Sequence, residues 1–204
     1  MSLLLSIVLL TAPTQPLAVH TAFAGGSGRV VKIDTTAHRV RILPKKQLRG
    51  GWESWWYVQI TGLQVGKPFY LEVGKSPWAT PKRAVFSVNG KVWRKTNRCE
   101  IKDGFACYVV KPTTTRMFFA WGQPFGLKNA NTLIDRVRRK LPAATSLVIA
   151  KSRQQRPVLA LSYQAPRHRL GVWIQARQHA WEVGSSWVGK GFIDWFASDD
   201  AAAK

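Results

Sequence analysis

The sequence predicts an α+β protein in which an N-terminal antiparallel β-sandwich is followed by the opening strands and helix of an α/β domain. From about Gly26 to Trp121, short apolar or alternating runs recur between turns that contain glycine. After Pro124 the apolar residues change to helical spacing. The chain of 204 residues is 46% hydrophobic and contains ten tryptophans, which is enough apolar material for a folded core.

The strands of the first part are identified from alternating, aromatic and β-branched runs. In chain order these runs are RVVKIDTTAHRVRIL, WWYVQITGL, PFYLEVG, RAVFSVNGKVWRK and TTTRMFFAWG. Turns are expected at Gly50–Gly51, Gly66–Lys67, Asn89–Gly90 and Asp103–Gly104. The Asn89–Gly90 pair predicts a hairpin between AVFSV and KVWRK, because Asn and Gly tolerate the positive φ angles of a tight turn. Strands at this spacing are typical of an antiparallel sandwich.

The two cysteines flank the Asp103–Gly104 turn in NRCEIKDGFACYV. A three-residue loop there would place Cys99 opposite Cys107, where a cross-strand disulfide is geometrically conceivable. The alternative is a pair of reduced, buried thiols. Two cysteines with no nearby histidine do not make a zinc site.

The second part begins with a helix, predicted from NTLIDRVRRKLP. Asn131 or Thr132 is the expected cap and Pro142 the stop. Two strands, SLVIAKS and PVLALSYQ, and the loop APRHR follow. Leu170–Ala176 is apolar on both faces, which predicts a strand in a sheet covered by helices. The last helix, Glu182 to about Ala197, places its larger apolar side chains on one face: Val188, Phe192, Trp195 and Phe196.

Residues 1–24 have the features of a signal peptide, leaving 25–125 as the β-sandwich domain and 126–204 as the α/β segment. Leu3–Leu10 is an apolar run of the length of a signal core and too short to span a bilayer. Small residues offer cleavage sites ending at Ala18 and, with a better fit, at Ala24. We therefore expect a secreted or periplasmic protein without a transmembrane segment.

The charge balance is strongly basic, with 31 Lys+Arg against 10 Asp+Glu and a net charge of +21. Such a charge attracts polyanions or acidic proteins. The cations are spread along the chain, which favours a generally basic surface over a dedicated nucleic-acid site. One functional hypothesis is therefore a basic, aromatic-rich β-domain that binds polyanions or acidic proteins. Most of the tryptophans lie in strand-like segments, however, and are expected in the core.

His179 and Glu182 lie where the apolar run GVWIQA meets the last predicted helix. Catalytic groups of open α/β sheets lie at the carboxyl ends of strands. A His-x-x-Glu pair at that position supplies two of the three protein ligands of a His₂Glu zinc site, in which the metal activates water. This spacing also arises by chance. The alternative is a histidine that caps the end of the strand and a glutamate in the first turn of the helix, where the helix dipole stabilises a negative charge.

The segment GVWIQARQHAWEVGSSWVGKGFIDWFASDD resembles the start of the catalytic domain of zinc metallocarboxypeptidases, specifically their cytosolic-carboxypeptidase-like branch. In that family an apolar strand runs into Arg-Gln-His-Pro-Gly-Glu and a helix that contains Trp. Upstream landmarks of the branch's β-sandwich occur in the same order: Gly25–Gly26, WESWWYVQITG, KVWRKT and MFFAWGQPFG. The resemblance covers residues 23 to 204.

The resemblance implies that His179 and Glu182 are the first two zinc ligands. It places Arg177 in the family's Arg-Gln-His triplet, as a catalytic-site residue that orients the site or contacts substrate; pairing with a structural carboxylate is the alternative. Arg156 corresponds to the arginine of the family's Gly-Arg-Asp segment, which implies a role in substrate binding. Two departures are Ala180–Trp181 in place of Pro-Gly and Pro157 in place of the aspartate.

The implied activity is removal of C-terminal residues from peptides or proteins, acidic ones among them, by zinc-activated water. No nucleic-acid partner is expected. The family's second zinc histidine, carboxylate-binding arginine and general-base glutamate lie beyond the matched segment. The other histidines, His20, His38 and His168, fall in the leader, an early strand and a loop. We therefore expect a fragment of the enzyme that is inactive alone.

Overall fold

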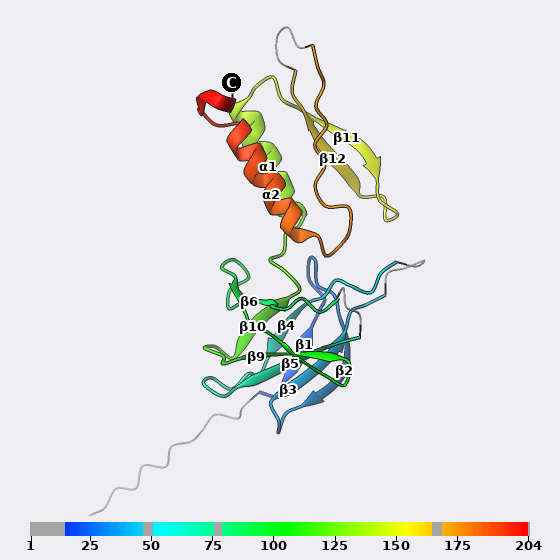
Figure 1. Cartoon of the computed structure of the whole chain (residues 1–204), viewed down its shortest axis with the longest axis vertical. Coiled ribbons are helices and arrows are strands. Elements are labelled where there is room, and N and C mark those ends of the chain that lie inside the picture. The colour runs from blue at the N-terminus through cyan, green and yellow to red at the C-terminus, as the bar shows by residue number, and fades with distance from the viewer. Residues whose placement is uncertain (1–14, 47–50, 76–78, 165–168, 204) are drawn as a thin grey trace, which may run out of the picture. The chain divides into compact units, whose positions relative to one another are not determined.

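The computed structural model describes residues 15–46, 51–75, 79–164 and 169–203 (Figure 1). The chain divides into two compact units, one up to Phe119 and one from Ala120. Each unit is described by itself below. The predicted leader core, Leu3–Leu10, lies outside the described residues. None of the helices in the described part of the chain has the length and apolar character needed to cross a bilayer.

The first unit, up to Phe119, is built of strands, and its last strand ends at Ala120. The strands are β1 (Ala18–His20), β2 (Arg29–Asp34), β3 (Arg39–Leu43), β4 (Tyr57–Thr61), β5 (Phe69–Gly74), β6 (Val85–Ser87), β7 (Arg94–Lys95), β8 (Glu100–Lys102), β9 (Phe105–Val110) and β10 (Arg116–Ala120). They form two five-stranded sheets, in the orders β1-β4-β10-β6-β7 and β2-β3-β5-β9-β8. The prediction of an antiparallel arrangement is wrong for one pair, because β3 and β5 run parallel.

The core of the first unit draws side chains from both sheets. In β3 buried and partly exposed residues alternate, as expected for a strand with one face on a core. Phe69 of β5 contacts Phe119 of β10, with 5.4 Å between the ring centroids. Trp56, just before β4, contacts Tyr108 of β9, with 5.9 Å between the ring centroids. Aromatic contacts of this kind therefore join the two sheets.

The tryptophans are less buried than the sequence predicts. Of those described, only Trp56 is fully buried. Trp55 and Trp93 are partly exposed, and each indole N–H donates a hydrogen bond to a backbone carbonyl, of Gly25 and Gly90 respectively. An indole is large and carries a polar N–H, so it commonly keeps one edge in solvent.

The hairpin predicted at Asn89–Gly90 is present, although its loop is longer than two residues. Strand β6 pairs antiparallel with β7 through Val85↔Lys95 and Phe86↔Arg94. The Asn89 carboxamide oxygen accepts hydrogen bonds from the backbone N–H groups of Lys91 and Val92. The side chain of Asn89 thus organises the turn, in addition to its backbone.

No disulfide forms, and the register of the β8–β9 hairpin explains why. Asp103 and Gly104 have φ of 51° and 77°, as in a two-residue turn in which both central residues have positive φ. This turn pairs Glu100 with Cys107, so Cys99 is one position out of register. Successive side chains point to opposite faces of a sheet, so the two thiols face apart. Both cysteines are free and partly buried.

The second unit, from Ala120, contains α1 (Leu127–Lys140), β11 (Thr145–Lys151), β12 (Pro157–Ser162), α2 (Val183–Phe196) and the short 3₁₀-helix η2 (Ala201–Ala203). Helix α1 begins earlier than the predicted cap, because Gly126 is its N-cap and the Asn129 side chain accepts a hydrogen bond from the Gly126 N–H. It ends before Pro142, as predicted.

A small apolar cluster holds the two helices of the second unit together, and the helices lie side by side (Figure 1). Its buried members are Leu133, Val137, Ala144 and Ala197. The Asp194 carboxylate of α2 pairs with Arg136 of α1 and with Lys190 one turn earlier.

The prediction of a buried strand at Leu170–Ala176 is wrong. The segment is in neither strand nor helix, and Leu170, Val172 and Trp173 are 86%, 84% and 70% exposed. The only sheet among the described residues of this unit is the antiparallel pair β11–β12, and β11 is exposed along its whole length. The apolar pattern is that of a strand with neighbours on both sides, and the described residues provide none.

Candidate functional site

His179 and Glu182 lie in the bend that leads into α2, and Glu182 is the N-cap residue of that helix. The segment before them is extended but unpaired, so the junction joins a loop to a helix. The two side chains nevertheless meet: His179 Nδ1 lies 2.6 Å from Glu182 Oε1. The spacing of the sequence motif therefore brings an imidazole and a carboxylate together.

The Glu182 carboxylate also fixes the backbone of the bend. Its Oε2 atom accepts hydrogen bonds from the backbone N–H groups of Gln178 and His179, each at 2.9 Å. The side-chain hydrogen bond with His179, followed by these backbone bonds, lowers the pKa of Glu182 to about 2. The carboxylate is thus ionised and held in one orientation, although it remains partly exposed.

Trp181, which stands where the resemblance has a glycine, packs against the histidine. The indole and the imidazole are stacked, with centroids 4.7 Å apart and an interplanar angle of 15°. With the carboxylate at Nδ1 and the indole against its face, the His179 ring is held on two sides. The stacking of Trp181 on His179 could not be predicted from the sequence, which shows only that a large residue stands at this position.

Arg177 is anchored to backbone carbonyls of its own unit. Its guanidinium donates hydrogen bonds to the carbonyl oxygens of Phe125, at 2.7 Å, and Ala180, at 2.9 Å. Burial lowers the pKa of Arg177, and the Glu182 charge opposes this effect. The residue has φ of 65°, which is unusual for a side chain with a Cβ atom. This geometry gives Arg177 a positioning role in the bend.

Trp187 connects the start of α2 to residues 123–125, the segment that Arg177 also contacts through Phe125. Its indole N–H donates to the carbonyl of Gln123 at 3.0 Å, and its ring meets Phe125 edge-on at 5.1 Å. Arg177 and Trp187 therefore both hold residues 123–125 beside the bend. This role of Trp187 is not evident from the sequence, in which the residue is marked only by its place in a helix that contains Trp.

Arg156 lies in the exposed turn between β11 and β12. Its backbone N–H donates to the Ser152 hydroxyl, and its carbonyl accepts from the Ser152 N–H. Within the described ranges its guanidinium forms no ion pair, and no contact joins it to His179 or Glu182. Its predicted role in substrate binding stays a prediction.

The donor atoms of the bend fit part of a zinc site. Two ligand atoms of a tetrahedral zinc lie about 3.4 Å apart, given metal–ligand distances near 2.1 Å. His179 Nδ1 and Glu182 Oε1 are 2.6 Å apart, so a small side-chain movement would admit a metal between them. Across the described ranges no three His, Cys, Asp or Glu side chains gather to hold a metal. The pair thus fits two ligands, and the described residues supply no third.

The other described histidines are engaged in the first unit. Buried His38 makes hydrogen bonds through Nδ1 with the Pro68 carbonyl and through Nε2 with the Gln64 N–H. His20 makes a hydrogen bond with the Thr61 hydroxyl. His168 lies outside the described residues.

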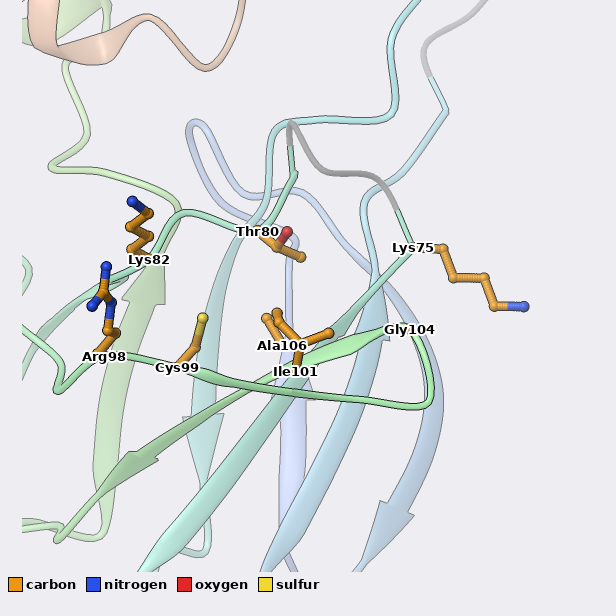
Figure 2. Close-up of a pocket in the computed structure, with 8 residues that line it drawn as sticks. All are labelled: Lys75, Thr80, Lys82, Arg98, Cys99, Ile101, Gly104 and Ala106. Carbon is orange, nitrogen blue, oxygen red and sulfur yellow. The ribbon is translucent and has the colours of Figure 1, made fainter.

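The first unit contains a second candidate site, a pocket of about 510 Å³ at the β8–β9 hairpin (Figure 2). It is lined by Lys75, Thr80, Lys82, Arg98, Cys99, Ile101, Gly104 and Ala106. Three of these residues are cationic, and none is acidic.

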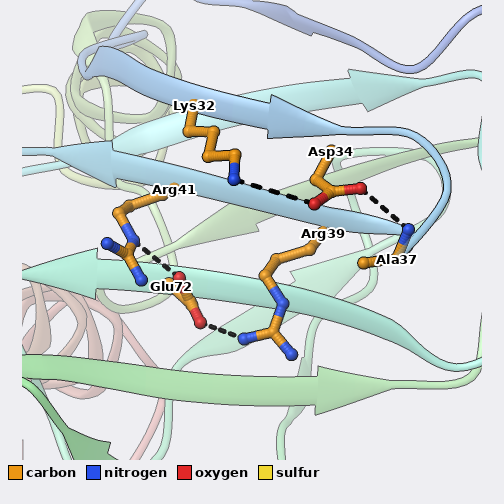
Figure 3. A network of polar contacts seen from close by, with 6 residues as sticks. All are labelled: Lys32, Asp34, Ala37, Arg39, Arg41 and Glu72. Atoms are coloured by element: carbon orange, nitrogen blue, oxygen red, sulfur yellow. Dashed lines mark hydrogen bonds and ion pairs between the residues drawn. The ribbon is translucent and has the colours of Figure 1, made fainter.

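Cations on one face of the same sheet, on strands β2 and β3, are paired with carboxylates (Figure 3). The Glu72 carboxylate is held between Arg39 and Arg41, whose Nε atom lies 2.7 Å from Oε2. Burial acts to raise the pKa of Glu72, but the hydrogen bonds from Arg41 and Arg39 outweigh it and lower the pKa. Lys32 lies 3.8 Å from Asp34. This face is therefore largely neutralised.

Comparison with known proteins finds relatives by sequence and by structure. No family model matches the chain. An uncharacterised protein of Zymomonas mobilis is 24% identical over 183 residues, which is 87% of this chain and 47% of that protein. A metallo-carboxypeptidase from Burkholderia cenocepacia matches with a TM-score of 0.80 and 20% identity, over 92% of this chain and 52% of that one.

Two further solved structures agree. A Burkholderia mallei protein classed as a carboxypeptidase matches with a TM-score of 0.83 and 20% identity, over 94% of this chain and 51% of that one. A metallo-carboxypeptidase from Pseudomonas aeruginosa, in complex with (2-guanidinoethylmercapto)succinic acid, gives 0.76 and 18%, over 91% and 50%. The chain thus spans about half the length of these proteins. The likeness confirms a mixed α+β fold of the kind found in metallo-carboxypeptidases.

Proposed function

We propose that this chain is part of a zinc-dependent metallocarboxypeptidase of the cytosolic-carboxypeptidase-like branch, which removes C-terminal residues from peptides or proteins. The observation that carries the proposal is the contact between His179 and Glu182 at the start of α2, in a chain whose fold matches metallo-carboxypeptidases. Secretion or export to the periplasm, predicted from residues 1–24, belongs to the same proposal.

His179 and Glu182 would hold the metal through Nδ1 and the carboxylate. A zinc ion, when bound, supplies a water of lowered pKa and polarises the substrate carbonyl. Arg177 orients the bend through the carbonyls of Phe125 and Ala180, and Trp181 restrains the imidazole from one face. The third ligand and the general base have to come from outside the described residues, so the pair alone is not a complete catalytic centre.

The proposal is tested by zinc binding to the full chain. Zinc is titrated while the imidazole resonances are followed by NMR, and bound metal is counted by native mass spectrometry. We expect His179→Ala and Glu182→Gln each to weaken binding about tenfold or more, because each removes one of two ligands. His20→Ala is the matched control, since His20 is an exposed histidine in the first unit. Equal zinc binding in the His179 and His20 variants would contradict the proposal.

A further inference from the structure

The pocket of the first unit gathers three cations that form no ion pair with any residue the structure describes. Lys82 and Arg98 stand at one side, and Lys75 stands at the opposite side (Figure 2). Within the described ranges none of their side chains forms an ion pair, whereas Arg39 and Arg41 of the same sheet unit share Glu72. Unpaired like charges around one hollow create a positive potential that favours an anion.

The space between these cations is lined by less polar groups. Cys99, Ile101 and Ala106 lie between the two sides, beside the Thr80 hydroxyl. Ile101 is 66% exposed although its strand belongs to a sheet. A ligand that fits would therefore have an apolar centre and anionic groups at both ends. The described lining contains no aromatic ring on which a nucleotide base could stack, which disfavours a nucleic acid.

Strand β8, beside the pocket, is the last strand of its sheet, in the order β2-β3-β5-β9-β8. The Cys99 N–H, just before it, is bonded to the Lys82 carbonyl on the side away from β9. Backbone groups alternate along a strand, so those of Ile101 point to the same open side. An edge strand of this kind can pair with an extended peptide, and pockets beside it then select the side chains.

From these features we propose that the β8 edge and its pocket form a binding site for an acidic peptide segment in extended conformation. The peptide backbone pairs with β8 at Ile101, and an apolar side chain covers the exposed side chain of Ile101. Carboxylates on either side of it meet Lys82 and Arg98 at one end and Lys75 at the other. This site goes beyond the proposed peptidase function and does not depend on a metal.

Binding is measured on the full chain by fluorescence anisotropy, with a fluorescein-labelled Glu-Asp-Leu-Glu-Leu-Glu peptide as the probe. The Lys82→Ala/Arg98→Ala variant is expected to bind about tenfold more weakly, because it removes two charge-assisted contacts. Lys91→Ala/Arg94→Ala removes the same charge from exposed positions of the same unit that do not line the pocket, and should change binding by less than about twofold. Equal losses in both variants would show attraction by the general surface charge and overturn the proposal.

Cys99 provides a readout that is specific to the pocket. Its thiol lines the hollow, whereas Cys107 lies on the other face of the hairpin. In a Cys107→Ser variant the bound peptide should slow alkylation of Cys99 by iodoacetamide, and in Cys99→Ser it should leave the alkylation rate of Cys107 unchanged. The site is disproved if the peptide protects neither thiol or both equally. It is also disproved if a single-stranded oligonucleotide protects Cys99 better than the peptide does. None of these results depends on zinc, so they leave the peptidase proposal untouched.

Discussion

Apolar segments are buried to different extents in the two units of this chain. In the first unit several large aromatic side chains are fully enclosed: Phe69, Tyr108 and Phe119 of the strands, and Trp56 just before β4. In the second unit the apolar side chains of Leu170–Ala176 are exposed. An apolar run predicts the capacity to be buried. Whether it is buried depends on the layers around it.

The number of strands explains the contrast. Each sheet of the first unit has five strands, and aromatic contacts join the two sheets. The second unit has a two-stranded sheet, which is marginal as an independent structure. Its buried cluster is limited to a few residues of the two helices and the connection after α1. The solved structures that share the fold are about twice as long as this chain.

Replacing one tryptophan in each unit tests this contrast most strongly. Trp56 is fully buried and donates a hydrogen bond to the Ala79 carbonyl, so Trp56→Ala should lower the free energy of unfolding by about 3–5 kcal/mol. Trp173 is 70% exposed, and Trp173→Ala should change it by about 0.5 kcal/mol or less. Hydrogen exchange of each unit, read by mass spectrometry, measures both effects. A large loss in the Trp173 variant would mean that the segment is packed in solution.

Two truncations probe how far the first unit extends toward the N-terminus. Strand β1 pairs with β4, Leu17 is buried, and the Phe23 ring contacts Tyr57. Removing residues 1–24 should therefore destabilise the first unit by about 2–4 kcal/mol, through lost apolar burial and strand pairing. Removing residues 1–14 deletes none of these contacts and is the control. N-terminal sequencing of exported protein then shows whether cleavage falls at Ala24, and a mature chain starting at Gly25 with unchanged stability would contradict this prediction.

The Glu72 network in the first unit is the next test. Glu72→Gln leaves Arg39 and Arg41 without their shared carboxylate and should lower stability by about 1–2 kcal/mol. The pKa of Glu72 is lowered in the folded state. Its contribution is therefore present above the unfolded-state pKa and is lost as the pH falls through the folded one.

Denaturation of the wild type and Glu72→Gln from pH 7 down to pH 2 shows this difference. The two stabilities should converge at the acid end of the series. Asp194→Asn, which removes a more exposed carboxylate from the second unit, should have a smaller effect. A constant gap between the wild type and Glu72→Gln at all pH values would contradict the assignment.

Local patterns predicted most of the elements, because turn chemistry and strand alternation are properties of neighbouring residues. The Asn89–Gly90 hairpin and the helix ending before Pro142 are confirmed. Of the two alternatives for the cysteines, the disulfide is wrong by one residue of loop length, because a two-residue turn at Asp103–Gly104 shifts the register of the hairpin; both thiols are free, as the other alternative states. The prediction of an antiparallel arrangement is wrong at β3–β5 for a different reason. Which strands pair, when they are distant in sequence, is not encoded in the local pattern.

At the candidate site, spacing alone brought His179 and Glu182 together, because a tight turn joins these residues three apart. The sequence did not predict what holds them. The stacking of Trp181 and the anchoring of Arg177 to Phe125 join residues through tertiary structure. A motif therefore identified the pair, and its surroundings had to be seen in the structure.

The smallest expected effect lies in the bend itself. Because the pKa of Glu182 is about 2, its hydrogen bonds to the Gln178 and His179 amides should persist well below the usual glutamate pKa and be lost only as the pH approaches 2. In the metal-free chain, the NMR shifts of these two amides should titrate with a midpoint near that value, and in Glu182→Gln this transition should be absent. Asp200→Asn, which removes a carboxylate at the other end of the unit, should leave the midpoint unchanged. A midpoint near pH 4.5 would mean that the carboxylate is not held by His179. The exposed bend would then resemble the segment before it, and the contrast between an ordered site and an irregular, exposed segment within the second unit would disappear.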